Sequence, residues 1–320
     1  MPAIDRTNLS GLIPEPVTRE IIQGAVAESA VLRMARRLPN MTSKTQTLNV
    51  LDALPTAYFV NGEATTTGAE QAAFKQTTSM AWDKKKIHAE EIAVIVPIPE
   101  AVLDDSDYDI WGEVRPRLTE AFGKVIDAAI LYGTNKPTSW RDGLLASATT
   151  ATATVKATDN IYDDIMGEGG VIAKVEESGY IPNGVMAAIQ LRSKLRGLKD
   201  TTGQPIFKTD MQGSTRYALD GMDMYFPING AFDPAKSLAI VGDWSQLVYS
   251  VRQDMTFKIF DSGIVQDPAT KAILYNLMQN DMVALRAVMR LGWEIPNPIN
   301  AFNVGNNKAF PFAVYEPAGG

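Results

Sequence analysis

The feature that most constrains the fold is a helical pattern over residues 107–133. Apolar side chains recur along it at intervals of three or four residues, and Asp104, Asp105 and Asp107 are candidate N-caps. The apolar positions are Ile110, Val114, Leu118, Phe122, Val125, Ile126, Ala129 and Ile130. At 1.5 Å per residue such a helix spans about 40 Å, a length that few globular helices reach. Pro116 is expected to kink its first half or to mark its true start.

The sequence before this helix predicts an arm, a shorter helix and a projecting loop. Residues 1–16 are punctuated by Pro and Gly and read as an extended arm, after which a helix runs until Pro39 stops it. Leu48 and Val50 indicate a short strand. Residues 58–82 are polar, rich in Thr and Gly, and without a strong helical period. A long loop or hairpin that projects from the domain is therefore predicted there.

Alternating apolar residues predict a strand from Ile92 to Ile98, ending at Pro99. Ala93 and Ile95 make its second face apolar as well, so burial on both sides is predicted. Residues 147–155 are low in complexity; they are expected at a surface or in an exposed strand, and they mark a domain boundary.

The rest of the chain predicts a second domain of mixed α and β structure. Helices are expected at about 161–178, capped by Gly179, and at 188–197, with a strand at 184–187 between them. Further strand candidates are residues 237–241, 257–260 and 282–295. A length of 320 residues also predicts about two domains.

Composition excludes much enzymology. The chain has no cysteine, which removes thiolate nucleophiles and cysteine metal sites, and a single histidine, which removes mechanisms that need two imidazoles. The net charge of −7 argues against a protein whose main task is to grip a phosphate backbone. There is no signal-peptide pattern and no apolar run of about 20 residues, so a soluble protein without membrane contact is predicted.

The remaining motifs favour structural roles over chemistry. His88 follows the lysine run 84–86, but no placed serine accompanies it, and an ordinary strand-entry histidine beside a solvated basic face is the better interpretation. Asp105, Asp107 and Asp109 begin like an EF-hand loop, yet Ile110 stands where that loop needs glycine. The glycines of 167–170 lack the third spaced glycine of a nucleotide-binding loop. No catalytic residue, cofactor site or metal site is predicted.

Taken in order, these features resemble the major capsid proteins of tailed bacteriophages, which have the Hong Kong 97 fold. Leu12-Ile13-Pro14-Glu15 resembles the start of the family's N-arm, and residues 58–82 lie where its extended E-loop would be. Residues 198–207, Leu219-Asp220-Gly221-Met222 and Gly242-Asp243-Trp244 resemble segments of its axial domain. The strongest signature is the run from Asp281 to Trp293, which resembles the strand that returns through both domains.

The resemblance implies an α+β fold with a defined division of the chain. The N-arm and its helix would be residues 1–40. The peripheral (P) domain would be 41–55, 88–137 and 245–288, with a spine helix at 107–133. The E-loop would be 56–87, the axial (A) domain 138–244 and 289–305, and a C-terminal tail 306–320. Assembly residues would be Gly62, Glu63, Gly68 and Lys75 in the E-loop, and Pro116, Phe122 and Ile126 on the spine helix.

The resemblance also implies a function. Copies of the chain would form hexamers and pentamers that close into an icosahedral shell around double-stranded DNA, made and assembled in the bacterial host cytoplasm and kept in the virion. Expected partners are other copies, a separate scaffolding protein or none, portal and decoration proteins, and packaged DNA through non-specific contact. Two alternatives remain: an encapsulin-like compartment that binds an enzyme's targeting peptide, and an enzyme that uses Asp or Glu groups brought together only by the fold.

Two further expectations concern maturation of the shell. Some members of the family join an E-loop lysine to an asparagine of a neighbour, with a glutamate as base. On this alignment those three positions are Thr67, Asp281 and Val288, so all three roles are vacant and no covalent crosslink is predicted. Lys75 and Asn280 are the residues that could rescue it. The shell is also expected to expand from a rounder precursor, with the spine helix straightening near Pro116 and the loop swinging at its ends.

Overall fold

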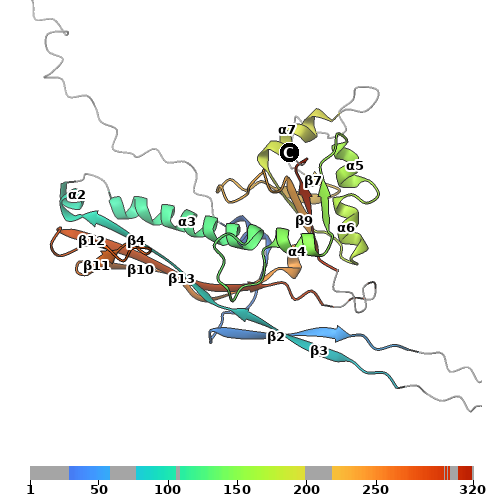
Figure 1. Cartoon of the computed structure of the whole chain (residues 1–320), viewed down its shortest axis with the longest axis horizontal. Helices are drawn as coiled ribbons and strands as arrows, with labels where there is room; N and C mark the ends of the chain where they lie inside the picture. The colour runs from blue at the N-terminus through green and yellow to red at the C-terminus, as the bar shows by residue number, and fades with distance from the viewer. Residues whose placement is uncertain are drawn as a thin grey trace, which may run out of the picture.

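The computed structural model describes residues 29–57, 77–105, 109–198, 218–298, 300, 302 and 309–318. Two sheets organise them (Figure 1): a long, narrow sheet lies under a long helix, and a second sheet is surrounded by shorter helices. A two-stranded hairpin projects from the region between these two parts.

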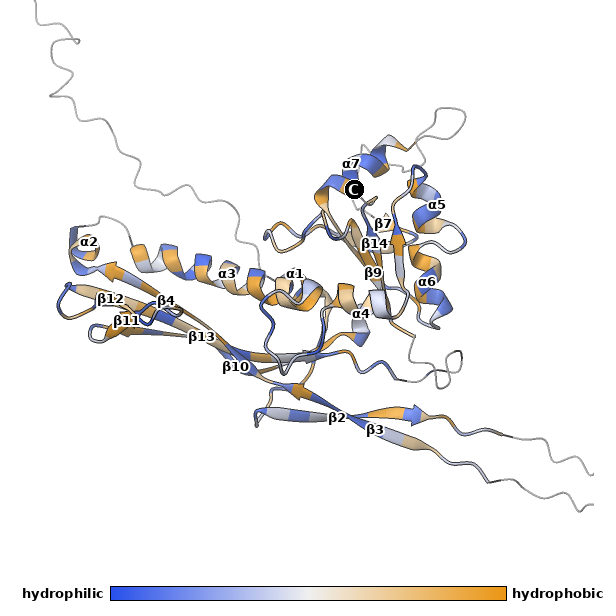
Figure 2. Cartoon of the chain, viewed as in Figure 1, coloured by the Kyte–Doolittle hydropathy of each residue, from blue (hydrophilic) through white to orange (hydrophobic). Residues whose placement is uncertain are grey.

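The long sheet has the strand order β1 (Arg36–Arg37), β10 (Val248–Phe260), β13 (Met282–Glu294) and β4 (Glu90–Pro99). The helix α3 (Ile110–Tyr132) covers one of its faces, and short α1 (Ala30–Met34) packs beside α3. Leu118 and Phe122 of α3 meet Leu285 and Ala287 of β13 in a small core. Apolar and polar residues alternate along α3 (Figure 2), as its sequence period predicts.

The helix α3 confirms the predicted long helix, with bounds that its end residues explain. Asp109 is its N-cap, accepting a hydrogen bond of 3.0 Å from the Gly112 backbone N–H, and Gly133 ends it in the left-handed conformation at φ 69°. Pro116 lies inside α3, six residues after its first residue, so the expectation that Pro116 marks the true start is wrong.

Strand β4 corrects a second prediction. Its residues alternate between a face that packs under α3, with Ile92, Val94 and Val96, and a face that no other part of the described chain covers. Ile95 on the second face is 49% exposed. The apolar pattern on both faces therefore does not correspond to burial on both faces within this chain.

The second sheet has the order β5 (Thr154–Lys156), β14 (Phe312–Glu316), β9 (Ala239–Gly242), β6 (Gly184–Ala187), β8 (Met222–Tyr225) and β7 (Ala218–Leu219). Around it lie α4 (Leu144–Thr150), α5 (Ile161–Met166), α6 (Val171–Glu177), α7 (Ile189–Gly197) and the 3-10 turn η2 (Trp244–Gln246). Every residue of β6 and β9 is buried, so these strands form the centre of the main core.

Several expectations are corrected in this part. The single helix expected at 161–178 is two helices, because the backbone leaves the helical conformation at Gly167, where φ is −77° and ψ is 172°, and α6 begins only after Gly170. The low-complexity run 147–155 contains the end of α4 and the start of β5, with Ala148 and Ala153 buried, and is no simple exposed strand. The expected tail 306–320 contains β14, which lies between β5 and β9 with Phe312 and Tyr315 fully buried.

The projecting hairpin pairs β2 (Thr45–Ala53) with β3 (Ala81–His88), with Thr45 opposite His88 at its root. Its two strands bracket the predicted loop, and the paired region begins before residue 56. At the far end of the long sheet, α2 (Glu100–Asp105) follows β4, and β11 (Ile264–Gln266) pairs with β12 (Ile273–Asn276). Strand β13 stays in the long sheet until Glu294, so the expected domain boundary after residue 288 falls within one strand.

Candidate functional site

The notable features of the described residues are exposed surfaces and contacts between segments, not a cluster of catalytic groups. Among them, no three His, Asp or Glu side chains lie close enough together to hold a metal ion. In the same residues, no helix is long and apolar enough to cross a membrane. His88 is the best candidate for a catalytic base in the sequence. Its backbone carbonyl accepts a 3.0 Å hydrogen bond from Trp140 Nε1. The features that need explanation are therefore a buried carboxylate, a groove, the hairpin root and several exposed faces.

The buried carboxylate of Asp127 joins three segments of the chain. Asp127 lies on α3 and is fully buried. Its Oδ1 accepts from Ser29 Oγ at 2.5 Å and from the Val31 N–H at 3.2 Å. Its Oδ2 accepts from the Ala30 N–H at 2.8 Å and from Asn229 Nδ2 at 2.5 Å. One side chain thus fixes the first turn of α1 and the loop after β8 against α3.

Burial raises the pKa of Asp127 above its ordinary value, although hydrogen bonds from Ser29, Ala30, Asn229 and Val31 act in the opposite direction. Within the described chain no cation pairs with the carboxylate, and its charge is stabilised by dipoles alone. Such a site holds a segment in position and carries no chemistry of its own.

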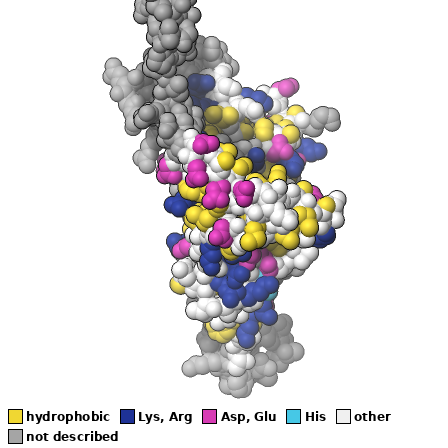
Figure 3. Space-filling model, turned by 90° about the vertical axis from the view of Figure 1, so that its left-hand side faces the viewer, with side chains coloured by type: hydrophobic (Ala, Val, Ile, Leu, Met, Phe, Trp, Pro, Cys, Tyr) yellow, Lys and Arg dark blue, Asp and Glu magenta, His cyan; other side chains and the backbone are white. Residues whose placement is uncertain are grey.

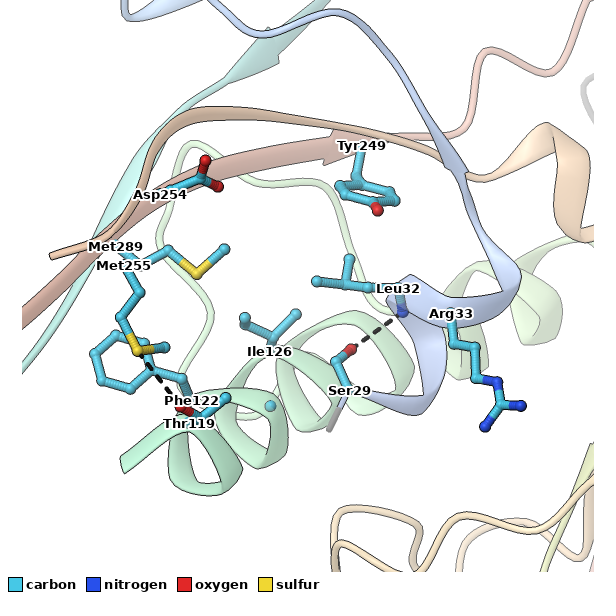
Figure 4. Close-up of a pocket in the computed structure, with 11 residues that line it drawn as sticks. Ser29, Leu32, Arg33, Thr119, Phe122, Ile126, Tyr249, Asp254, Met255 and Met289 are labelled. Carbon is cyan, nitrogen blue, oxygen red and sulfur yellow. Dashed lines mark hydrogen bonds between the residues drawn. The ribbon is translucent and has the colours of Figure 1, made fainter. Parts of the chain in front are cut away.

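A groove lies between α1, α3 and the long sheet, with a volume of about 580 Å³. Leu32 of α1, Ile126 of α3 and Tyr249 of β10 all point into it (Figure 4). Met255 and Met289 line its inner end, and Arg33 and Asp254 also line it. The lining is mainly apolar and holds no cluster of acid and base groups.

The root of the projecting hairpin is packed tightly against the long sheet. Ile87 is fully buried together with Met41, Ala89 and Val248. Residues 81–84 of β3, farther from the root, are exposed, with Trp82 at 62%. In the lysine run, Lys84 and Lys86 are exposed, which fits the predicted solvated face. Lys85 is half-buried, and burial, followed by the nearby Arg141, lowers its pKa.

Exposed apolar side chains gather at the β11–β12 end of the long sheet. They are Ile259, Phe260, Ile264, Ile273, Leu274, Tyr275 and Met278, each at least 37% exposed. Figure 3 views the molecule from this end and shows apolar side chains interspersed among a group of acidic side chains and, below it, a group of basic ones. Exposed apolar side chains concentrated in one place are typical of a surface that another molecule covers.

The predicted site residues fall into three groups. Gly62, Glu63, Thr67, Gly68 and Lys75 lie outside the described residues. On the spine helix, Phe122 and Ile126 are 3% and 2% exposed, and both line the groove between α1, α3 and the long sheet.

The remaining predicted positions lie on or next to β13. Asp281 is in the turn before this strand at φ 47°, and its carbonyl accepts from the Glu100 N–H. Asn280, in the same turn, accepts from the Asn276 N–H at 3.0 Å. Val288 lies on the sheet face away from α3, where Arg286 and Arg290 flank it. Position 288 therefore presents an aliphatic side chain, which can act as neither an acid nor a base.

Asp127 is a buried positioning residue that the sequence analysis missed. The signal available was a lone acidic residue between Ile126 and the apolar Ala128–Leu131 run of an amphipathic helix. Its four donors are distant in sequence, so no spacing rule would have found them.

Comparisons with known proteins give these features a common context. Residues 10–307 match the Phage capsid family. The major capsid protein of Staphylococcus phage 80alpha is 25% identical over 309 residues, covering 94% of this chain and 84% of the relative. A solved chain from Mycobacterium phage Bobi is 32% identical with a TM-score of 0.82, covering 99% of this chain and 100% of its own.

Two further solved structures extend the comparison. A chain from Microbacterium phage Oxtober96 is 31% identical with a TM-score of 0.83, covering 98% of this chain and 99% of its own. A capsid chain of a native GTA particle, at 17% identity and a TM-score of 0.64, shares the fold. The α+β Hong Kong 97 fold expected from the sequence is confirmed. Since the match spans almost the whole chain, this protein belongs to the phage capsid family.

Proposed function

We infer that this chain is the major capsid protein of a tailed double-stranded DNA phage, and that its copies assemble as hexamers and pentamers into an icosahedral shell around the genome. The observation that carries this inference is the likeness in sequence and fold to phage proteins along nearly the full length of the chain. The exposed apolar end and the uncovered face of β4 support it, because a shell would cover both.

A structural role accounts for the described residues better than catalysis does. Its relatives are capsid proteins, and charged residues of the described chain such as Arg141 and Glu294 form ion pairs with one another. In a shell, each modest contact is repeated by symmetry, so no single interface has to be tight. The protein is therefore proposed to be a virion component without enzymatic activity.

The function is tested by expressing the chain alone and examining it by negative-stain electron microscopy and sedimentation. We expect closed shells or capsomer rings, and DNA in particles made during infection. Particles filled with an enzyme instead of DNA would favour the encapsulin-like alternative. A protein that stays monomeric alone and with the neighbouring phage gene products would contradict the proposal.

We also propose that the mature shell lacks covalent crosslinks. The family's isopeptide bond needs an amine, a carboxamide and a base at its three positions, and here Thr67 is no amine, Asp281 is no carboxamide and Val288 is no base. On a denaturing gel, mature particles should give a single band near 34.8 kDa. A ladder of bonded subunits would contradict this, and its loss in Lys75→Arg or Asn280→Ala would identify the bond.

Maturation is proposed to move the spine helix and the loop. Pro116 lacks the N–H that would complete the helical ladder to Gly112, so α3 has a point of low bending resistance. Maps of precursor and mature shells should differ in the bend of α3 at this residue. An identical bend in both would defeat the hypothesis.

The division into parts is proposed with the bounds that the sheets indicate. The peripheral domain would include β13 up to Glu294, and the axial domain would include β14. Residues 1–28 would form most of the N-arm, and the β2–β3 hairpin would carry the E-loop over a neighbouring copy. Portal, decoration and scaffolding proteins are further proposed partners, with only non-specific contact to DNA.

A further inference from the structure

Two cations face each other on the long sheet, on the side away from α3. Lys258 of β10 and Arg286 of β13 are directly opposite in the strand register. Both line a depression of about 250 Å³, together with Val288 and Ile95. Lys258 is exposed, and the guanidinium of Arg286 lies over the Phe260 ring, 4.8 Å from its centre. Within the described part of the chain, neither has an ion-pair partner.

This arrangement is unfavourable for an isolated chain. Like charges directly opposite in an antiparallel pair destabilise the sheet. The same face shows the compensated alternative, because Arg290 binds Glu91 across β13 and β4, with Arg290 Nε 2.7 Å from Glu91 Oε2. An anionic partner would offset the repulsion, and an arginine held on an aromatic ring presents a fixed pair of donors that suits a carboxylate.

The chain also carries an exposed acidic area. It lies at the end of the long sheet, on α2 and at the start of α3, and contains Glu100, Asp104, Asp105 and Asp109. Asp104 and Asp105 are exposed at the C-terminal end of α2, where negative charge is unfavourable to the helix dipole. Within the described residues, neither forms an ion pair.

We propose that Lys258 and Arg286 of one copy bind the carboxylates of Asp104 and Asp105 of a neighbouring copy. The inference rests on the proposed function, since a ring of identical subunits needs two different surfaces of one chain that are complementary to each other. The cationic pair and the acidic end of α2 are such surfaces: they are opposite in charge and without ion-pair partners inside the described chain, with Lys258, Asp104 and Asp105 exposed and Arg286 half-buried. The contact is electrostatic, so its strength falls as ionic strength rises.

The first test is direct chemical evidence of proximity. The full-length wild-type chain is mixed in isotopically labelled and unlabelled forms and treated with a carbodiimide, which joins an amine to a carboxylate at zero length. Mass spectrometry should find Lys258 joined to Asp104 or Asp105 in peptides of mixed label, because the two side chains belong to different copies. This product forms whether the copies make shells or only smaller rings. Its absence from mixed-label peptides would overturn the proposal.

The second test exchanges the charges. Lys258→Glu with Arg286→Glu should reduce assembly at least tenfold by sedimentation, and Asp104→Lys with Asp105→Lys should do the same. All four changes in one chain should restore assembly. Each copy then carries an acidic pair at positions 258 and 286 and a basic pair at positions 104 and 105, which are again complementary between neighbours. The matched control is Lys174→Gln with Glu177→Gln, which removes an ion pair on α6, outside this depression, and should leave assembly unchanged. Urea midpoints should remain near wild type in every variant.

Three further outcomes would decide against the proposal, and a fourth would separate it from the proposed function. Normal assembly of either double reversal would overturn it, and so would failure of the fourfold variant to recover. If the basic-face variant formed intact shells that lost their DNA, that face would bind nucleic acid and not a second copy. A wild-type chain that gives the mixed-label product but never a shell would contradict the proposed function and leave this contact standing.

Discussion

Replacing Asp127 by alanine should lower the free energy of unfolding by about 3–5 kcal/mol. The change leaves the Ala30 and Val31 N–H groups and Asn229 Nδ2 without the acceptor that they share inside the protein. The hydroxyl of Ser29, which is only partly buried, can turn to water. Urea unfolding of the unassembled full-length chain measures the loss, and Asp159→Ala, which removes an exposed aspartate, is the matched control.

The same variant should weaken assembly by more than its stability loss suggests. Asp127 is the group that fixes the start of α1 to α3, and α1 leads directly from residues 1–28. Without the hydrogen bonds to Asp127, the start of α1 would no longer be fixed to α3, and the point from which the N-terminal segment extends into the shell would vary. Protease sensitivity near Ser29, followed by N-terminal sequencing of the fragments, should rise in Asp127→Ala and not in Asp159→Ala.

Asp127 should also leave a signature in the pH dependence of stability. Burial raises its pKa in the folded protein above the unfolded value, so the folded state binds more protons in the interval between the two values. Its contribution to stability is therefore fully present below the unfolded pKa and is lost as pH rises through the raised, folded pKa. The Asp127→Asn variant lacks this titrating proton, so subtracting its stability curve from that of the wild type should show that slope. Parallel curves would contradict the assignment.

The elements that could be predicted from the sequence are those specified by local periodicity. The pattern of α3 contains about six turns, so an error at either end leaves the helix in place, and β6 lies between clear turn signals. The break at Gly167–Gly170 was missed because the apolar spacing on both sides fits one helix. Strand β14 was missed because four buried residues near the end of a chain look the same as an apolar tail.

The candidate site was harder to predict because its parts are assembled by the fold. Asp127 and Ser29 are 98 residues apart, and Lys258 meets Arg286 only through the register of β10 and β13. The apolar second face of β4 led to a prediction of burial that the single chain does not fulfil. The pattern of apolar residues in a sequence reflects burial in the finished assembly. An apolar face that the single chain leaves uncovered therefore indicates a surface that a neighbouring subunit covers.

Replacing Gly292 by alanine should disrupt the root of the projecting hairpin. Gly292 lies on β13 opposite Ser250, and a β-carbon there would overlap the His88 carbonyl oxygen and lie 2.7 Å from Ile87 Cγ2. Backbone cannot give way as the end of a flexible side chain can. The same carbonyl accepts from Trp140 Nε1, so moving His88 also strains a second contact. We expect a loss of about 3 kcal/mol in unfolding free energy.

Gly197→Ala is the matched control for this change. Gly197 ends α7, a β-carbon there would meet nothing within 4 Å, and its backbone is helical, so alanine should leave stability unchanged or raise it by up to about 1 kcal/mol. Gly292→Ala should also assemble poorly. The root packs the β2–β3 hairpin against the long sheet, so a shift there changes the direction in which the hairpin projects. Equal unfolding free energies for the two variants would show that β13 can shift to admit the methyl group, and that the root does not set the hairpin's direction.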